Sequence, residues 1–242
     1  MTKTVASFIA FILLFSFQAS AGLLDDALKA VEKSPAKSLQ KGPDDKTTAS
    51  GLKEALDIGA RNAVKEVSKT DGYFSNQAIK ILLPEKIRKA GDLLSTVGYK
   101  KEVDDFVLSM NRAAEKAAPK AAPIFADAIK HMTFDDAQKI LRGGNTAATD
   151  FFKEKTRTKL FEEFKPVVTG SMDKVGVAQS YKKMTAGYSN IPFMKKEDID
   201  LDNYVTNKSL DGLFVMVGQE EQKIRTDPAA RVTDLLKKVF GK

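Results

Sequence analysis

A single histidine is the first residue to examine for chemistry, because general-base catalysis and acyl transfer commonly use this side chain. His131 is the only histidine in the 242-residue chain, and no Gly-x-Ser-x-Gly motif accompanies it. The surrounding pattern places His131 in the last turn of a predicted helix, where the helix dipole favours a cation. A structural role therefore explains His131, and a catalytic role is the alternative.

Three alternating carboxylates, Asp198, Asp200 and Asp202, resemble the first half of a calcium-binding loop. The second half departs from that pattern, because Asn203 stands where the loop needs glycine and Ser209 where it needs glutamate. We therefore expect Asp202 to cap the helix that follows and the other two carboxylates to be solvated. Metal binding by the three is the alternative, and we predict no cofactor.

The segment Arg142-Gly143-Gly144-Asn145 places a positive charge and a flexible backbone just before a predicted helix, a combination that can bind an anion. No Lys-Ser/Thr pair of a phosphate-binding loop follows, so a glycine that ends the preceding helix is the simpler interpretation. Together with His131, these four residues are the candidate binding residues of the chain.

Two pairs of opposite charge, Glu221 with Arg225 and Asp227 with Arg231, are spaced four residues apart on predicted helices. Such pairs are typical of helix surfaces and stabilise a helix by only about a few tenths of a kcal/mol. Burial would be needed to give either pair a larger role.

The first residues have the features of a signal peptide. Lys3 precedes an apolar run from Val5 to Phe17, and Ala19-Ser20-Ala21 has the small-x-small form of a cleavage site. The run is too short to span a bilayer, which needs about 20 apolar residues, and no later stretch is long enough. Residues 1–21 are thus predicted to be removed near Ala21, which leaves a periplasmic or secreted protein. Without cysteine, the chain has no lipidation site and no disulfide.

The charge balance is basic, with 39 lysines and arginines against 32 acids and a net charge of +7. The positive residues are mostly lysines scattered among acids, without interleaved aromatic residues, so we expect no nucleic-acid partner. A solvated surface is the simplest explanation. Contact with anionic envelope material such as phospholipid head groups is the alternative.

Apolar residues at helical spacing predict an all-α protein with one helical domain over residues 50–242 and no substantial sheet. Residues 22–49 are predicted to form a short amphipathic helix and a flexible linker. Ile79 to Leu82, before Pro84, predict a packed loop. About eight to ten helices are expected in a bundle. The first four are residues 50–68, a helix from Pro84 to a stop at Gly98, residues 101–118, and a helix around 124–132 after breaks at Pro119 and Pro123. They are followed by a short helix with a capping box at Thr133, by a long helix that is capped by Asn145 or Thr146, kinked at Pro166 and ended by Gly176, by residues 178–184, and by a terminal pair.

The terminal pair, within Asp202 to Phe240, is the stretch around which the other helices are expected to pack, because both of its apolar stripes need a partner. Thr226-Asp227-Pro228 separates the two helices. Gly212 and Gly218 lie inside the first helix, where each costs about 1 kcal/mol relative to alanine. We expect Gly212 to contact the small-residue face formed by Ala55, Gly59 and Ala63.

Several short motifs recur in an order that resembles a bacterial family, domain of unknown function 4197, from about Ser50 to the end. They are Thr133-Phe134-Asp135-Asp136-Ala137, Phe164-Lys165-Pro166-Val167-Val168, Asp173-Lys174-Val175-Gly176, Asp202-Asn203-Tyr204-Val205-Thr206, Leu210-Asp211-Gly212-Leu213-Phe214, Pro228-Ala229-Ala230-Arg231 and Asp234-Leu235-Leu236-Lys237-Lys238-Val239-Phe240. The resemblance implies an exported helical protein of a bacterial envelope. It implies no activity and no site.

The sequence favours a non-enzymatic binding or structural role, since no nucleophile, base and orienting group can be assembled from it. The expected partner is an envelope protein or an apolar or anionic ligand such as lipid. The alternative is a hydrolase or a metal-dependent enzyme that uses His131 or the Asp198/Asp200/Asp202 loop.

Overall fold

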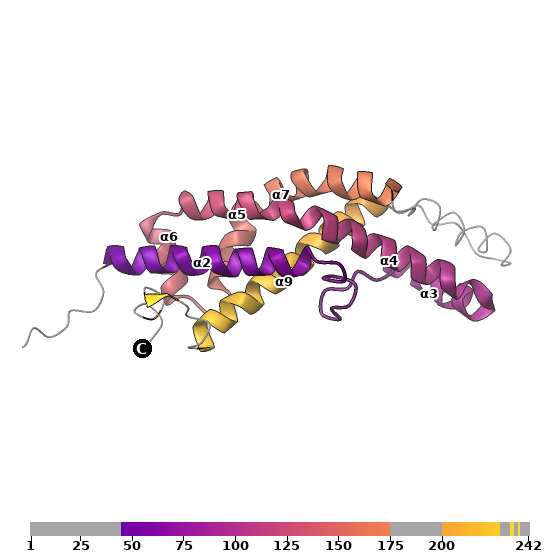
Figure 1. Ribbon diagram of the computed structural model, residues 1–242, viewed down its shortest axis with the longest axis horizontal. Coiled ribbons are helices and arrows are strands. Elements are labelled where there is room, and N and C mark those ends of the chain that lie inside the picture. The colour runs from indigo at the N-terminus through magenta and orange to yellow at the C-terminus, as the bar shows by residue number, and fades with distance from the viewer. Residues whose placement is uncertain (1–44, 175–199, 228–232, 235–236, 238–242) are drawn as a thin grey trace, which may run out of the picture. The chain divides into compact units, whose positions relative to one another are not determined.

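The computed structural model describes residues 45–174, 200–227, 233–234 and 237, all of which belong to a unit formed by residues 43–242. The described part is helical and contains no strand (Figure 1). A turn of π-helix, η1 (Ser95–Tyr99), joins α3 to α4, and a turn of 3-10 helix, η2 (Ala118–Lys120), joins α4 to α5. The α-helices are α2 (Asp45–Val67), α3 (Glu85–Leu94), α4 (Lys100–Ala117), α5 (Ala121–Lys130), α6 (Phe134–Arg142), α7 (Ala147–Lys174) and α9 (Leu201–Thr226).

The all-α class is confirmed, but the expected eight to ten helices are not. Within the described residues the helices form five separate segments, because α3, α4 and α5 follow one another without a loop. The chain reverses direction at Gly98, whose φ of 104° is the left-handed conformation that glycine adopts easily. Pro119 sits in the first turn of η2, where its missing N–H is not needed. The predicted helix at 178–184 and most of the helix after Pro228 lie outside the described residues.

Other predicted boundaries moved by a few residues. Residues 45–49, expected before the first helix of the domain, already belong to α2. Pro123 does not break the chain, because it lies in the first turn of α5, where proline is tolerated. Pro166 lies inside α7, which continues to Lys174.

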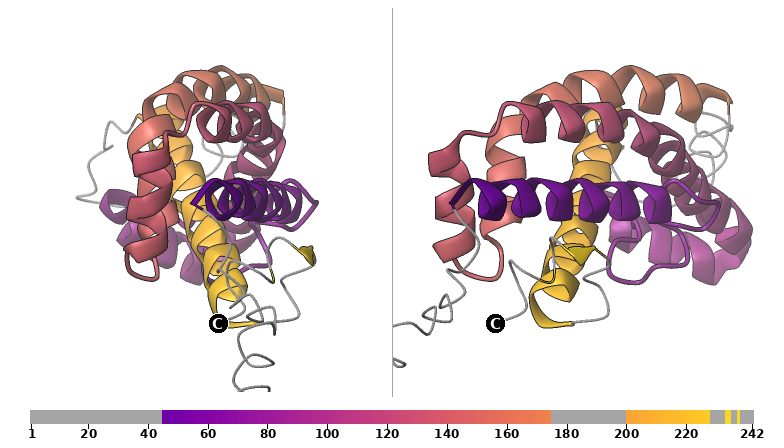
Figure 2. Two further views of the ribbon diagram at one scale, coloured as in Figure 1. Left: turned by 90° about the vertical axis from the view of Figure 1, so that its left-hand side faces the viewer. Right: turned by 60° about the vertical axis from the view of Figure 1, so that its left-hand side comes forward.

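Helix α9 packs against α2, α4 and α7, so the first helix of the predicted terminal pair does have a central place (Figure 2). Its buried face includes Val205, Leu210, Leu213, Phe214 and Val217. Gly212 and Met216 are buried as well, so a wide face of α9 is covered by its three neighbours.

Aromatic rings fill the space between α5, α7 and α9. The ring of Phe125 lies 4.8 Å from that of Phe152 and 6.2 Å from that of Phe214, measured between centroids. Both pairs are tilted, an arrangement that aromatic rings favour. All three side chains are almost completely buried, so they fix how these helices are spaced.

The predicted packed loop before Pro84 is confirmed. Ile79, Ile81 and Leu83 are buried, whereas Leu82 is exposed. The side chain of Asn111 on α4 takes the place of a neighbouring strand: it accepts a hydrogen bond from the Ile81 N–H at 2.9 Å and donates one to the Ile81 carbonyl at 2.8 Å. Both backbone groups of the buried Ile81 are therefore satisfied without a sheet.

Tyr73 anchors the start of the same connection. Its hydroxyl donates to the carbonyl of Ser209 on α9 at 2.6 Å. The buried carboxylate of Glu115 accepts the Tyr73 N–H at 3.1 Å and forms an ion pair of 2.7 Å with Arg112. Burial, with the nearby charges of Glu115 and Asp211, raises the pKa of Tyr73 far above its usual value.

Candidate functional site

Two adjoining hollows lie between α5, α6 and α7. The first, of about 300 Å³, is bounded by all three elements. The second, of about 240 Å³, lies between α6 and α7 and shares Asp136, Phe151 and Lys155 with the first. We call the two together the α5–α7 groove.

The floor of the groove is apolar. Ile124 and Ala128 lie one turn apart on α5, and Phe151 and Ile140 add side chains from α7 and α6. On α7 the residues Phe151, Lys155 and Lys159 follow at intervals of four, so one face of this helix supplies both apolar and charged lining. Ile124, Ile140 and Phe151 are buried, and the floor is therefore continuous with the core.

His131 lies at the groove, at the C-terminal end of α5, as predicted. Its Nδ1 is 2.9 Å from the carbonyl oxygen of Asp127 and 3.3 Å from the carboxylate of the same residue. Because a carbonyl oxygen can only accept, Nδ1 carries the proton, which leaves Nε2 as an acceptor in the neutral ring. Lys159 lies 3.5 Å from the other carboxylate oxygen of Asp127, so Asp127 contacts both His131 and Lys159.

Asp136 forms the predicted capping box at the start of α6. The Thr133 hydroxyl accepts the Asp136 N–H at 3.1 Å, and the Asp136 carboxylate accepts the Thr133 N–H at 3.0 Å. Hydrogen bonds from the Thr133 side chain and backbone, aided by the charges of Lys155 and Lys139, lower the pKa of Asp136. This carboxylate is therefore ionised at neutral pH.

The rim of the groove carries both signs of charge. Four acids line it, Asp127, Asp136, Asp150 and Glu154, together with Lys139, Lys155 and Lys159. Glu154 pairs with Lys155 at 2.8 Å and raises its pKa, and Asp150 accepts the Thr146 hydroxyl at 3.0 Å. The arrangement can bind an apolar group on its floor and polar groups of either charge at its edge.

The candidate segment Arg142-Gly143-Gly144-Asn145 is exposed and begins with the last residue of α6, whereas His131 precedes that helix. Neither hollow is lined by the loop, so of the candidate binding residues the groove includes His131 alone. Two N–H groups at the start of α7, those of Ala148 and Thr149, already bind the carboxylate of Glu221 at 3.0 and 2.9 Å. Anion binding by the loop stays a prediction, and it would need other donors.

The pair Glu221 and Arg225, expected on the surface, is instead buried between α9, α7 and α6. Its side chains are 4% and 16% exposed, and the guanidinium is 2.8 Å from the carboxylate. Arg225 also donates to the carbonyl of Ile140 at 3.0 Å. The spacing of four residues identified the pair, but only the position of Glu221 between Val217 and Ile224 on the apolar stripe indicated its burial.

In the acidic loop, Asp200 caps α9 rather than Asp202. The Asp200 carboxylate accepts the N–H of Asn203 at 2.9 Å, and Asp202 instead accepts the hydroxyl of Thr169 at 2.7 Å. Asp202 lies inside the first turn, where the helix dipole stabilises its negative charge. The N-cap position is two residues earlier, at Asp200. Asp198 lies outside the described residues, and no group of three His, Cys, Asp or Glu side chains in the described part is placed to hold a metal ion.

A family model described as a protein of unknown function (DUF4197) matches residues 42–241. Neither a curated protein nor a solved structure matches the chain. Among the described helices, none combines the length and the apolar character needed to cross a membrane.

Proposed function

The chain belongs to the DUF4197 family of proteins of unknown function, and from its own residues we propose that it binds an amphipathic ligand in the bacterial envelope. The α5–α7 groove is the proposed site. The proposal is supported by one feature of this groove: its floor is apolar, and its rim carries both positively and negatively charged side chains.

The rim favours a ligand whose polar part carries both charges. A purely anionic head group would meet Asp127 and Asp136, and a purely cationic one would meet Lys155 and Lys159. A zwitterionic head group can place each charge beside its opposite, which limits the desolvation penalty on both sides. The hollow of about 300 Å³ is at the small end of ligand sites, so it fits a head group and a few carbons while the rest of a chain extends along the open side.

Location in the envelope is supported by the leader-like start of the sequence, with Lys3, the apolar run from Val5 to Phe17 and the cleavage motif at Ala19-Ser20-Ala21. N-terminal sequencing of protein from the periplasmic fraction should find Gly22 first. Protein that keeps Met1 and remains in the cytoplasm would contradict export, without bearing on the groove.

The ligand class can be tested with three probes that share a twelve-carbon chain: dodecylphosphocholine, dodecyl phosphate and dodecyltrimethylammonium, each below its micelle concentration. Calorimetric titration should show one site that binds the zwitterion about tenfold more tightly than either charged probe, a difference of about 1.4 kcal/mol. Equal affinity for the three would contradict the assignment.

Substitutions locate the site. Ala128→Phe fills the floor and should abolish binding, whereas Ala126→Phe, on an exposed position of the same helix outside the groove, should not. Lys159→Ala should weaken binding of the zwitterion, with Lys130→Ala as its exposed control on α5. Binding that survives Ala128→Phe in a folded protein would place the ligand elsewhere.

A hydrolytic function is the second candidate, and the pairing of His131 with Asp127 at the groove favours it, because an oriented imidazole with an accessible Nε2 can act as a general base. Turnover of a p-nitrophenyl ester of a short fatty acid, lost in His131→Gln, would support this alternative over simple binding. Equal rates for both proteins would contradict it.

A further inference from the structure

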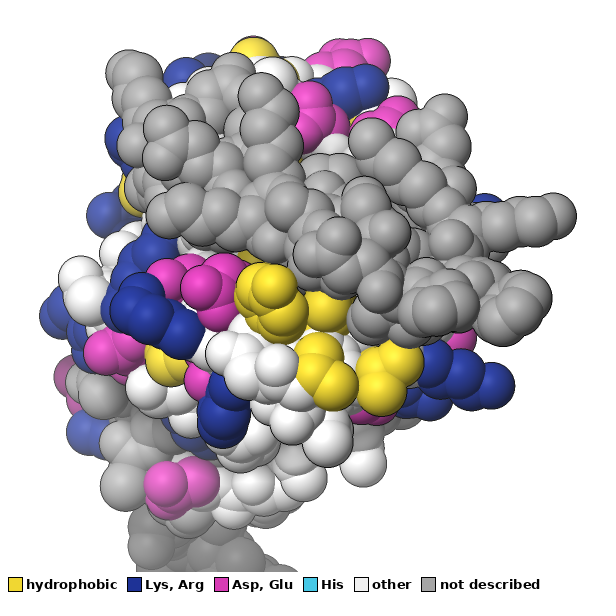
Figure 3. Space-filling model, turned by 90° about the vertical axis from the view of Figure 1, so that its right-hand side faces the viewer, with side chains coloured by type: hydrophobic (Ala, Val, Ile, Leu, Met, Phe, Trp, Pro, Cys, Tyr) yellow, Lys and Arg dark blue, Asp and Glu magenta, His cyan; other side chains and the backbone are white. Residues whose placement is uncertain are grey.

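The hairpin made by α3, η1 and α4 carries exposed apolar side chains at its end. Leu93 and Val97 are 40% and 55% exposed and lie one helical turn apart. Figure 3, which looks onto the side of the molecule that holds this hairpin, shows hydrophobic side chains grouped beside lysine and arginine side chains. We call residues 93–101 the hairpin tip.

The hairpin tip has a defined backbone conformation and is packed against the rest of the domain. Gly98 makes the reversal with a φ of 104°, a conformation that most side chains would disfavour. Leu83, which precedes α3, packs closely against Gly91 of that helix. A Cβ added at Gly91 would lie 2.2 Å from the Cδ1 atom of Leu83. The Tyr204 hydroxyl on α9 donates to the Leu82 carbonyl at 2.9 Å, which ties the approach to α3 to the rest of the domain.

Several polar side chains of the tip already have partners within the hairpin. The hydroxyls of Ser95 and Thr96 donate to the carbonyls of Gly91 and Asp92 at 2.9 and 3.0 Å. On the α4 side, Lys101 forms an ion pair of 2.6 Å with Asp105. Moving this tip from water to a less polar medium therefore leaves the hydroxyls of Ser95 and Thr96 with their partners, which lowers the desolvation cost.

Two lysines continue the exposed face of α3 away from the tip. Lys86 and Lys89 precede Leu93 at helical spacing, and neither forms an ion pair among the described residues. The face thus reads Lys86, Lys89, Leu93 and Val97, cationic along the helix and apolar at the end. Lysines beside a small apolar insertion match a phospholipid surface, whose anionic phosphates lie above its acyl chains.

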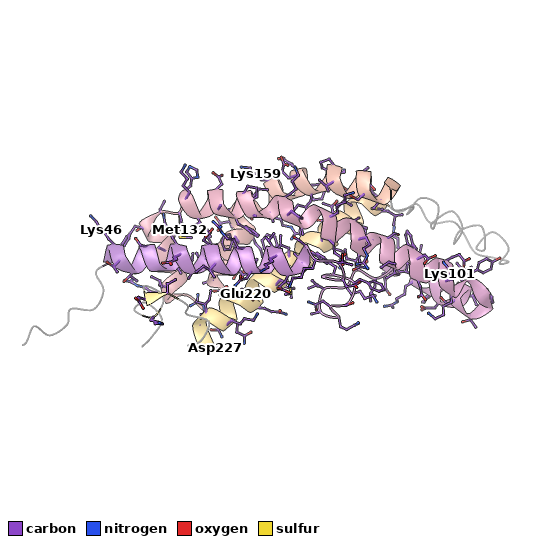
Figure 4. All side chains as sticks on the ribbon, viewed as in Figure 1. Lys46, Lys101, Met132, Lys159, Glu220 and Asp227 are labelled. Atoms are coloured by element: carbon purple, nitrogen blue, oxygen red, sulfur yellow. The ribbon has the colours of Figure 1, made fainter. Side chains whose placement is uncertain are left out.

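We propose that the hairpin tip docks on an anionic phospholipid surface, with Leu93 and Val97 among the head groups and Lys86 and Lys89 at the phosphates. This contact is separate from the α5–α7 groove: Figure 4 shows Lys101 at the hairpin and Lys159 on α7, at a different part of the domain.

Co-sedimentation of the chain from residue 22 to residue 242 with vesicles tests the proposal. The protein should bind vesicles of phosphatidylglycerol and phosphatidylcholine, and bind much less to phosphatidylcholine alone or at high salt. Leu93→Ser with Val97→Ser, and separately Lys86→Glu with Lys89→Glu, should each weaken binding about tenfold or more.

Matched controls separate the tip from general effects. Val215→Ser removes an exposed valine from α9, and Lys130→Glu with Lys153→Glu makes the same charge change on α5 and α7. These proteins should bind as the wild type does. Unchanged binding by the tip variants, or an equal loss in the controls, would overturn the proposal.

Two further readouts distinguish the remaining outcomes. The wild type could instead self-associate and fail to bind vesicles, with the self-association lost in the tip variants. That result would show that the tip contacts a second copy of the chain, and it would overturn lipid docking. Dodecylphosphocholine titration of the same variants should be unchanged, because the groove is elsewhere. Failure of the groove proposal would abolish that titration in all proteins and leave the vesicle result intact.

Discussion

The carboxylate of Glu221 binds Thr149 twice, through the backbone N–H at 2.9 Å and the hydroxyl at 2.8 Å, although the two residues are 72 positions apart. Helix α7 is thus capped by a residue of α9, whereas most helices are capped by a neighbour in sequence. Arg225 neutralises the buried charge from the next turn of α9. The cap and the ion pair form one unit that joins two helices.

Glu221→Ala should lower the free energy of unfolding by about 3 to 5 kcal/mol, because Arg225 would remain buried without its carboxylate and two N–H groups of α7 would lose their acceptor. Glu221→Gln, which keeps the shape but not the charge, should lose less. Urea denaturation measures both, with Glu162→Ala, an exposed acid on α7, as the control. A loss no larger than that of the control would mean that the buried pair contributes little.

Gly212 and Gly218, six residues apart on α9, should respond oppositely to alanine. A Cβ at Gly212 would lie 2.7 Å from the ring of Tyr73 and 3.1 Å from the Cβ of Ile79, so Gly212→Ala should destabilise by about 1 to 3 kcal/mol. At Gly218 the nearest atom would be the Thr149 hydroxyl at 3.5 Å, an ordinary contact. Gly218→Ala should therefore stabilise by about 0.5 to 1 kcal/mol. Thermal or chemical denaturation that ranks the two variants the other way would contradict this packing.

Tyr73→Phe should lose about 0.5 to 1.5 kcal/mol at neutral pH, since the hydrogen bond to Ser209 is removed. The difference should shrink in alkali. Because the folded pKa of Tyr73 is raised, its contribution to stability is full below the unfolded pKa of about 10 and is lost as pH rises above it, at about 1.4 kcal/mol per pH unit. Denaturation of both proteins from pH 8 to 11 tests the sign. A gap that widens with pH would be incompatible with a buried, protonated Tyr73.

Thr133→Ala should destabilise by about 1 kcal/mol through loss of the cap of α6, with the exposed Thr158→Ala on α7 as control. The pKa of Asp136 is lowered in the folded protein, so the stability from this carboxylate is present above its unfolded pKa and disappears as pH falls through the folded one. The difference between wild type and variant should consequently diminish in acid. Equal losses at neutral and acid pH would show that the carboxylate takes no part.

Local features of the fold were predictable from the sequence because their causes are local. The capping box at Thr133 and the helix end at Gly98 depend on a few adjacent residues, and the loop before Pro84 follows from the conformational limits of proline. His131 was placed correctly at the end of its helix for the same reason.

Features that depend on which helix faces which were not predictable. Gly212 was expected to meet the small face at Ala55, Gly59 and Ala63, but it meets Tyr73 and Ile79, while Gly59 lies against Ile224 of the same α9. Spacing shows which stripe of a helix is buried, but not the partner or its register. Likewise, the sequence indicated His131 but not Lys155 and Lys159, since their common groove depends on how α5 and α7 are placed.

The long-range cap of α7 also bears on the order in which the chain takes shape during synthesis. A ribosome completes α7 well before it reaches Glu221, so the first turn of that helix lacks its acceptor, and the face that α9 covers stays open, until α9 has been made. Contacts of such large sequence separation form late. The nascent domain should therefore stay incompletely packed through most of translation, and a stop codon placed before α9 should yield a protease-sensitive product rather than a smaller stable domain.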